Sequence, residues 1–140
     1  KDTTMFRPVK ILNAGTNVPE IFRLPATAET VYHAGDALVL TSGALTHATA
    51  TSKPTYIAAA DAAAGEATVP VYAVTPDVIF EAPLSAAPTG LVVGSAVTLA
   101  VDSSSSAAYG VTATTTSGVA TIVDLCHAAA SGDTVRVNFR

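Results

Sequence analysis

The sequence predicts an all-β protein: a small β-barrel or sandwich built from two three-strand repeats, with an extended N-terminal arm and at most short helical turns. Three observations support this prediction. Valine, isoleucine, threonine and tyrosine alternate with polar residues at period two, and turns rich in glycine and proline separate the runs. One phrase also occurs twice, as AAAGEATVPVY at 62–72 and AAASGDTVRVNF at 128–139.

Residues 1–26 are predicted to form an extended arm, because they contain Pro8, Pro19 and Pro25. Proline has no N–H to give to a strand ladder, so such a segment is at best an edge strand. Residues 1–23 carry four cations and two acids, whereas the rest of the chain carries three cations and nine acids. A basic arm on an acidic body indicates an extended segment that meets an acidic partner.

Residues 27–140 are predicted to form a single β domain, with a first repeat at about 30–82 and a second at about 90–140. The run GSAVTL at 94–99 matches GDALVL at 35–40, and the turn TSG occurs in both copies. The serine-rich stretch 102–110 is an insertion in the second copy and is predicted to be a loop tip. A lone three-strand unit has an apolar face and two open edges, so two copies are expected to close against each other.

Motifs for chemistry are missing from the sequence. The histidines His33, His47 and His127 have no metal-ligand spacing, and the single Cys126 excludes an intramolecular disulfide. On a strand, Cys126 and His127 would face opposite ways, which predicts a buried structural cysteine beside a surface histidine. No phosphate loop or serine nucleophile motif occurs. We therefore expect no enzymatic activity, no cofactor and no metal.

The composition indicates a protein that is covered by a partner or coated with hydroxyl groups. Charged residues make up 13% of the chain, about half the usual share of a soluble domain. No apolar run approaches the roughly 20 residues of a membrane helix. The tyrosines are not interleaved with arginines as on a nucleic-acid platform. The sequence thus predicts neither a membrane nor a nucleic-acid partner.

The stretch 35–81 resembles the head-decoration, or capsid cement, proteins of tailed bacteriophages. It has a Gly-Asp strand, a TSG turn, a strand reaching Ile-Ala-Ala-Ala-Asp, a VPVYAV strand and a VIFEA return. The resemblance implies a structural virion protein, made in the host cytoplasm, that binds the outer capsid surface and stabilises it. It also implies the major capsid protein as partner and a homotrimer on the shell.

The resemblance implies that the arm docks on the shell. The apolar anchors of the arm would be Phe6, Val9, Ile11 and Phe22. Its cations, Arg7, Lys10 and Arg23, would meet carboxylates of the shell. A glycan-binding or adhesin-like β module is one alternative, and it would need an exposed platform made from the four tyrosines. A subunit of a fibre or sheath is another, and a small hydrolase is the last.

Overall fold

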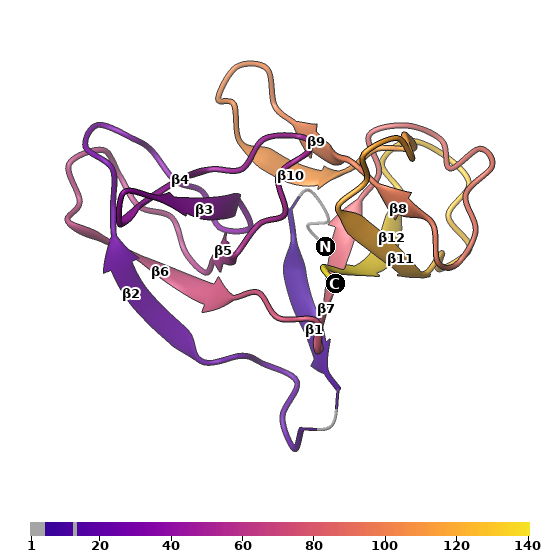
Figure 1. Cartoon of the computed structure of the whole chain (residues 1–140), viewed down its shortest axis with the longest axis horizontal. Coiled ribbons are helices and arrows are strands. Elements are labelled where there is room, and N and C mark those ends of the chain that lie inside the picture. Colours follow the sequence, from indigo (N-terminus) through magenta and orange to yellow (C-terminus); the bar gives the residue numbers. More distant parts are fainter. Residues whose placement is uncertain (1–4, 13) are drawn as a thin grey trace.

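The structure, a computed structural model, describes residues 5–12 and 14–140, so residues 1–4 and 13 of the predicted arm lie outside the described residues. The described residues form twelve strands and no helix, which confirms the all-β class (Figure 1). The strands are β1 (Arg7–Ile11), β2 (Ile21–Pro25), β3 (Ala37–Thr41), β4 (Ala44–His47), β5 (Tyr56–Ala58), β6 (Thr68–Ala73), β7 (Val78–Pro83), β8 (Ala96–Val97), β9 (Leu99–Val101), β10 (Ala108–Val111), β11 (Ala120–Asp124) and β12 (Thr134–Asn138).

The strands form two antiparallel sheets in a sandwich-like arrangement that is not closed into a barrel. One sheet has the order β1-β7-β12-β11-β8. The other has the order β2-β6-β5-β3-β10-β9, with β4 paired to β3. In Figure 1 the first sheet lies on the right and most of the second on the left, with β1 and β7 near the middle.

The pairing reveals two four-strand repeats, each with its first strand beside its fourth. The first repeat runs β2-β6-β5-β3 and the second runs β7-β12-β11-β8. Phe22 pairs with Val71 in the first repeat. Phe80 pairs with Val137 in the second. The twice-written Thr-Val-x-Val phrase therefore occupies the same register in both copies.

The same hydrogen bonds recur at the turn before the second strand of each repeat. The N–H of Gly35 donates to the carbonyl of Ala58, and that of Gly94 donates to the carbonyl of Ile122, both at 2.8 Å. Both glycines have a positive φ, 89° and 97°, which glycine adopts without steric cost. The structure places the repeat boundaries one strand earlier than predicted, because each repeat begins with a strand, β2 or β7, that lies before the residues leading to the matching Gly motif.

The described part of residues 1–26 does not form the separate extended arm that the sequence predicted. Instead it contributes two strands to the sandwich, since β1 pairs with β7 and β2 pairs with β6. Phe6 is 1% exposed and belongs to the core. The prolines are compatible with these strands because β1 and β2 lie at sheet edges, where a missing N–H breaks no internal ladder.

Two clusters of buried side chains hold the sandwich together. The larger one centres on Phe6, Phe80 and Phe139, and the smaller one on Tyr32 and Leu38. Strand β3 contributes Ala37 to the first cluster and Leu38 to the second, because alternate residues of a strand face opposite sides. Strand β3 therefore couples the two clusters.

The serine-rich insertion is only partly a loop. Residues 102–106 are exposed, but Ala107 and Ala108 are buried and strand β10 begins at Ala108. This strand pairs with β9 and reaches across to β3. The prediction of a loop over all of 102–110 was wrong. Composition alone does not distinguish small residues of a loop from small residues that pack in a strand beside a neighbouring strand.

Candidate functional site

The structure divides the predicted shell-binding residues between two sheets. Phe6 is fully buried, while Val9 and Ile11 are half-buried and Ile11 packs against the larger core cluster. Phe22 and Arg23 lie on β2 at the edge of the other sheet and are exposed. A side chain that fills the core cannot anchor a partner, so the prediction for Phe6 conflicts with its burial.

One of the two cations of β1, Arg7, belongs to a charged row on the first sheet. Arg7 forms an ion pair with Glu81, its cross-strand neighbour. Glu81 in turn lies opposite Arg136, which lies opposite Asp124. Opposite charges in directly facing positions stabilise a sheet, by roughly 0.2–1 kcal/mol for each pair. Arg7 thus contributes to the sheet itself, whereas Lys10 is exposed to solvent.

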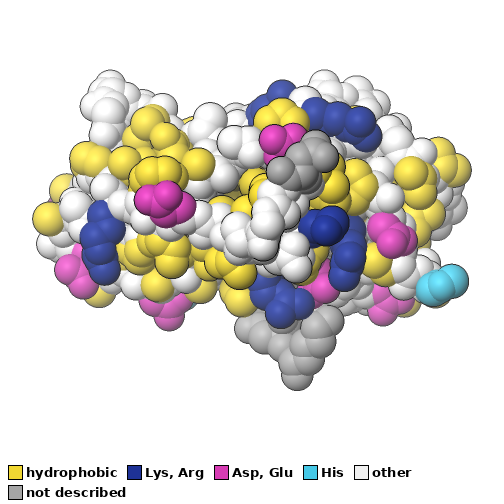
Figure 2. Space-filling view, turned by 90° about the horizontal axis from the view of Figure 1, so that it is seen from below, with side chains coloured by type: hydrophobic (Ala, Val, Ile, Leu, Met, Phe, Trp, Pro, Cys, Tyr) yellow, Lys and Arg dark blue, Asp and Glu magenta, His cyan; other side chains and the backbone are white. Residues whose placement is uncertain are grey.

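Strand β2 and the residues just before it carry three exposed apolar side chains. Ile21 is 52% exposed and Phe22 45%. Val18, in the loop that leads into β2, is 59% exposed. Figure 2 shows hydrophobic side chains mixed with charged ones on the half of the molecule where β2 lies, with most of the visible Lys and Arg nearer the middle. We call residues 18–23 the β2 edge surface.

Ile21 and Val18 were not singled out in the sequence. The signal that could have found Ile21 is the motif Ile-Phe-x-x-Pro, which occurs at 21–25 and again at 79–83. Such a duplication invites a comparison of burial between the two copies.

The outer edge of β2 presents main-chain polar groups. The N–H of Ala26 donates to the carbonyl of Ala67, on the β6 side. Main-chain groups of alternate strand residues point to opposite sides, so those of Ile21 and Arg23 point away from β6. No strand of the described residues pairs with this part of the edge. Such a row of N–H and C=O groups is a template for another strand.

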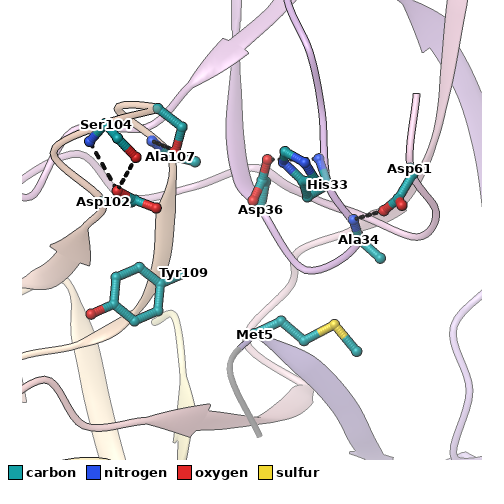
Figure 3. A pocket seen from close by; sticks show the side chains of 10 residues that line it. Met5, His33, Ala34, Asp36, Asp61, Asp102, Ser104, Ala107 and Tyr109 are labelled. Atoms are coloured by element: carbon teal, nitrogen blue, oxygen red, sulfur yellow. Dashed lines mark hydrogen bonds between the residues drawn. The ribbon is translucent and has the colours of Figure 1, made fainter. Parts of the chain in front are cut away.

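A hollow of about 700 Å³ lies between the turn at 33–36 and the loop at 102–107 (Figure 3). Its three carboxylates each accept hydrogen bonds from neighbouring residues of the chain. Asp36 accepts the N–H of His33, and Asp102 accepts the N–H and hydroxyl of Ser104. Asp61, on the same side as Asp36, accepts the N–H of Ala34.

Burial and hydrogen bonding shift the pKa values of these carboxylates in opposite directions. Burial raises the pKa of Asp36, which is 4% exposed, above its ordinary value. The hydrogen bonds from Ser104 lower the pKa of Asp102. Within residues 5–12 and 14–140, no group of three or more His, Cys, Asp or Glu side chains could hold a metal ion.

A second hollow, of about 460 Å³, contains Cys126 and His127. The prediction that Cys126 is buried on a strand was wrong, because both residues lie in an exposed turn after β11 with φ values of 53° and 58°. The N–H of Cys126 donates to the Asp124 carboxylate. Partial desolvation and the neighbouring Asp124 raise the pKa of the Cys126 thiol, which disfavours the nucleophilic thiolate.

The four tyrosines do not form an exposed platform. Tyr32 is fully buried, and its hydroxyl donates to the carbonyl of Leu45. Tyr56, Tyr72 and Tyr109 are half-buried. A glycan platform would need a flat exposed aromatic surface, so the structure offers little support for that alternative. In the described part of the chain, no helix has the length and apolar character needed to cross a membrane.

Comparisons with known proteins show a likeness in fold. No family model matches the sequence. No curated protein matches it either. Among solved structures, the chain is similar to the N base of head fibre gp8.5 of bacteriophage phi29. The TM-score is 0.53 at 18% sequence identity, and the match covers 86% of this chain and 95% of that chain.

Proposed function

We propose that the protein is a non-enzymatic structural component of a phage particle that attaches to the outer surface of the head shell and stabilises it. The observation that carries the proposal is the likeness in fold to a phage head-fibre base over nearly all of that chain. The stabilising role is the expectation that came from the resemblance of residues 35–81 to capsid cement proteins. The major capsid protein would be the partner, with a homotrimer of this chain on the shell.

The β2 edge surface is the part of the molecule that we assign to the shell contact. It combines exposed Ile21, Phe22 and Val18 with the cation of Arg23. Ile21 and Phe22 follow each other on β2 and face opposite sides of the sheet, so a partner that covers both must enclose the free edge of this strand. This assignment replaces the expected role of Phe6 as an anchor and retains Phe22 and Arg23.

Binding to purified shells tests this assignment. Replacing Ile21 and Phe22 by serine should reduce co-sedimentation with shells about tenfold or more, because large apolar contacts at the centre of an interface carry much of the binding energy. The matched control replaces Val92 and Val93 by serine, since these valines are 63% and 64% exposed on a different turn. Equal binding by both variants would remove the β2 edge surface from the contact.

A fibre subunit is the second candidate, and the likeness to a head-fibre base favours it. The two candidates differ in copy number and in assembly. A cement protein would match the major shell protein in copies per particle, whereas a fibre base would be present in far fewer. Quantitative peptide mass spectrometry on purified particles separates them, and absence of the chain from particles would overturn both.

A further inference from the structure

The first strands of the two repeats share a sequence motif but differ in their covering. Strand β2 reads Ile-Phe-Arg-Leu-Pro, and residues 79–83 of β7 read Ile-Phe-Glu-Ala-Pro. Phe80 is 0% exposed, whereas Phe22, its equivalent, is 45% exposed. Two phenylalanines in matching positions of one chain therefore provide an internal comparison of a covered and an uncovered site.

The residues just after these two strands form equivalent bridges. Ala26, just after β2, forms a parallel bridge with Leu45. Leu84, just after β7, forms a parallel bridge with Val111. The difference between these two strands therefore lies in their N-terminal parts.

Strand β1 covers that part in the second repeat. It pairs antiparallel with β7, so that Arg7 faces Glu81 and Pro8 faces Phe80. Phe6 and Phe80 each pack edge-on against Phe139, with ring centroids 5.6 Å apart. In the first repeat the register places Ala73 at the position of Phe139, so that Phe22 has no equivalent aromatic neighbour there.

We infer that the outer edge at 21–23 accepts an extended strand from a partner protein, in the way that β7 accepts β1. The incoming strand supplies a large apolar side chain over Phe22 and one carboxylate opposite Arg23. The carboxylate follows from charge: Glu81 of β7 receives Arg7, and Arg23 occupies the position equivalent to Glu81. Backbone hydrogen bonds then give affinity while these two side chains give specificity.

The position of Glu20 limits the acidic character of the partner strand. Glu20 is exposed, and it is equivalent to Val78, which faces Ile11 of β1. A run of acids on the incoming strand would bring like charges together at this end. The chemistry that fits is therefore a single carboxylate beside a large apolar residue.

A second copy of this chain does not supply that strand through β1. Its β1 is already paired with β7, and it would place Arg7 against Arg23. Like charges in facing positions destabilise a sheet. The inference depends on the proposed function only for the source of the strand, which would be the shell protein.

Two peptides and two forms of the full-length protein test the charge rule. The first peptide has the sequence of residues 5–12, MFRPVKIL, and the second is the same peptide with Arg7→Glu. The wild-type protein should bind the acidic peptide roughly fivefold more tightly than the basic one, as measured by NMR titration. Arg23→Glu should invert this preference. The largest amide shifts should fall on Ile21 and Arg23.

Lys53→Glu is the matched control, because it changes net charge equally at an exposed position in another loop. It should leave the preference unchanged. A copy of the acidic peptide that is N-methylated at residue 7 lacks the N–H expected to bond to the edge, and its binding should be lost. A preference that Arg23→Glu does not invert, or shifts centred on another strand, would overturn the inference.

Shell binding separates this inference from the proposed function. Shell binding without a peptide preference would leave the proposed function in place and remove strand addition. A peptide preference in a protein that does not bind shells would retain the acceptor edge and assign it to another partner.

Discussion

Asp36 illustrates how a buried carboxyl group sets a local pH dependence. Asp36 Oδ2 accepts the N–H of His33, and His47 Nδ1 lies 3.9 Å from the same oxygen. Burial raises the pKa of Asp36, and this effect outweighs the opposing influence of His33 and His47. The folded state therefore binds the Asp36 proton more tightly than the unfolded state does.

We predict that Asp36→Asn raises the free energy of unfolding relative to the wild type, and that it does so more at neutral pH than at acid pH. A raised pKa gives stability that is fully present below the unfolded value of 3.8 and is lost as pH rises through the folded value. Asparagine keeps an oxygen for the His33 N–H but carries no charge. Urea unfolding at pH 3 and pH 7 measures the free energy of unfolding of both proteins, and the difference in favour of the variant should be larger at pH 7. An identical difference at both values would contradict this origin.

The equivalent phenylalanines of the two repeats should respond differently to truncation. Phe80→Ala removes a fully buried ring and should lower the free energy of unfolding by about 3–5 kcal/mol. Phe22→Ala removes a half-exposed ring and should cost less than about 1 kcal/mol. Denaturant titration of both variants measures the difference. Similar losses at the two positions would mean that Phe22 contributes to the core of the isolated protein.

At the scale of elements, β1 is an integral strand of its sheet. It brings Phe6 and Ile11 to the larger core cluster and covers the edge of β7. The loop from 12 to 20 that joins β1 to β2 has no strand within its described residues. The chain can therefore be cut in this loop without cutting either sheet.

We predict that deletion of residues 1–26 prevents stable folding, because it removes both β1 and β2 with the buried Phe6. Cleavage at a protease site inserted at 15–17 should instead leave the β1 fragment bound. Size-exclusion chromatography of the cleaved protein, followed by mass spectrometry, measures co-elution. Release of the fragment from a still-folded body, seen by circular dichroism, would restore the interpretation of residues 1–26 as a separate arm.

At the scale of the whole molecule, the two repeats share strands. Strands β9 and β10 come from the second half of the chain and extend the sheet of the first repeat. Strand β5 contributes Ile57 to the larger core cluster and Ala58 to the smaller one. Neither repeat buries its apolar face without the other.

We therefore predict a single cooperative unfolding transition. Ile57→Ala and Leu38→Ala each remove a fully buried side chain, from different clusters, and each should cost about 2–5 kcal/mol. Because the clusters are coupled, both variants should lower the midpoint of the same transition. Amide NMR signals followed through urea denaturation would report the two clusters separately. Two transitions, each lowered by only one variant, would show independent repeats.

The sequence by itself determined the class of fold and the existence of the repeat. Alternation at period two is a local property, and it specifies strands wherever one face is buried. The phrase Thr-Val-x-Val marks the fourth strand of each repeat, and the structure pairs Val71 with Phe22 and Val137 with Phe80. Predicted shell-binding residues on β2, Phe22 and Arg23, are exposed because this strand lies at a sheet edge.

Only the tertiary structure decided which of the two Ile-Phe strands is covered. Both β1 and β2 are short, proline-containing and extended, so local sequence does not distinguish a strand that joins a distant edge from one that leaves its edge open. The pairing of β1 with β7 joins residues about seventy positions apart, as in Arg7 with Glu81. That nonlocal choice buries Phe6 and Phe80, leaves Phe22 exposed, and so decides which edge remains for a partner.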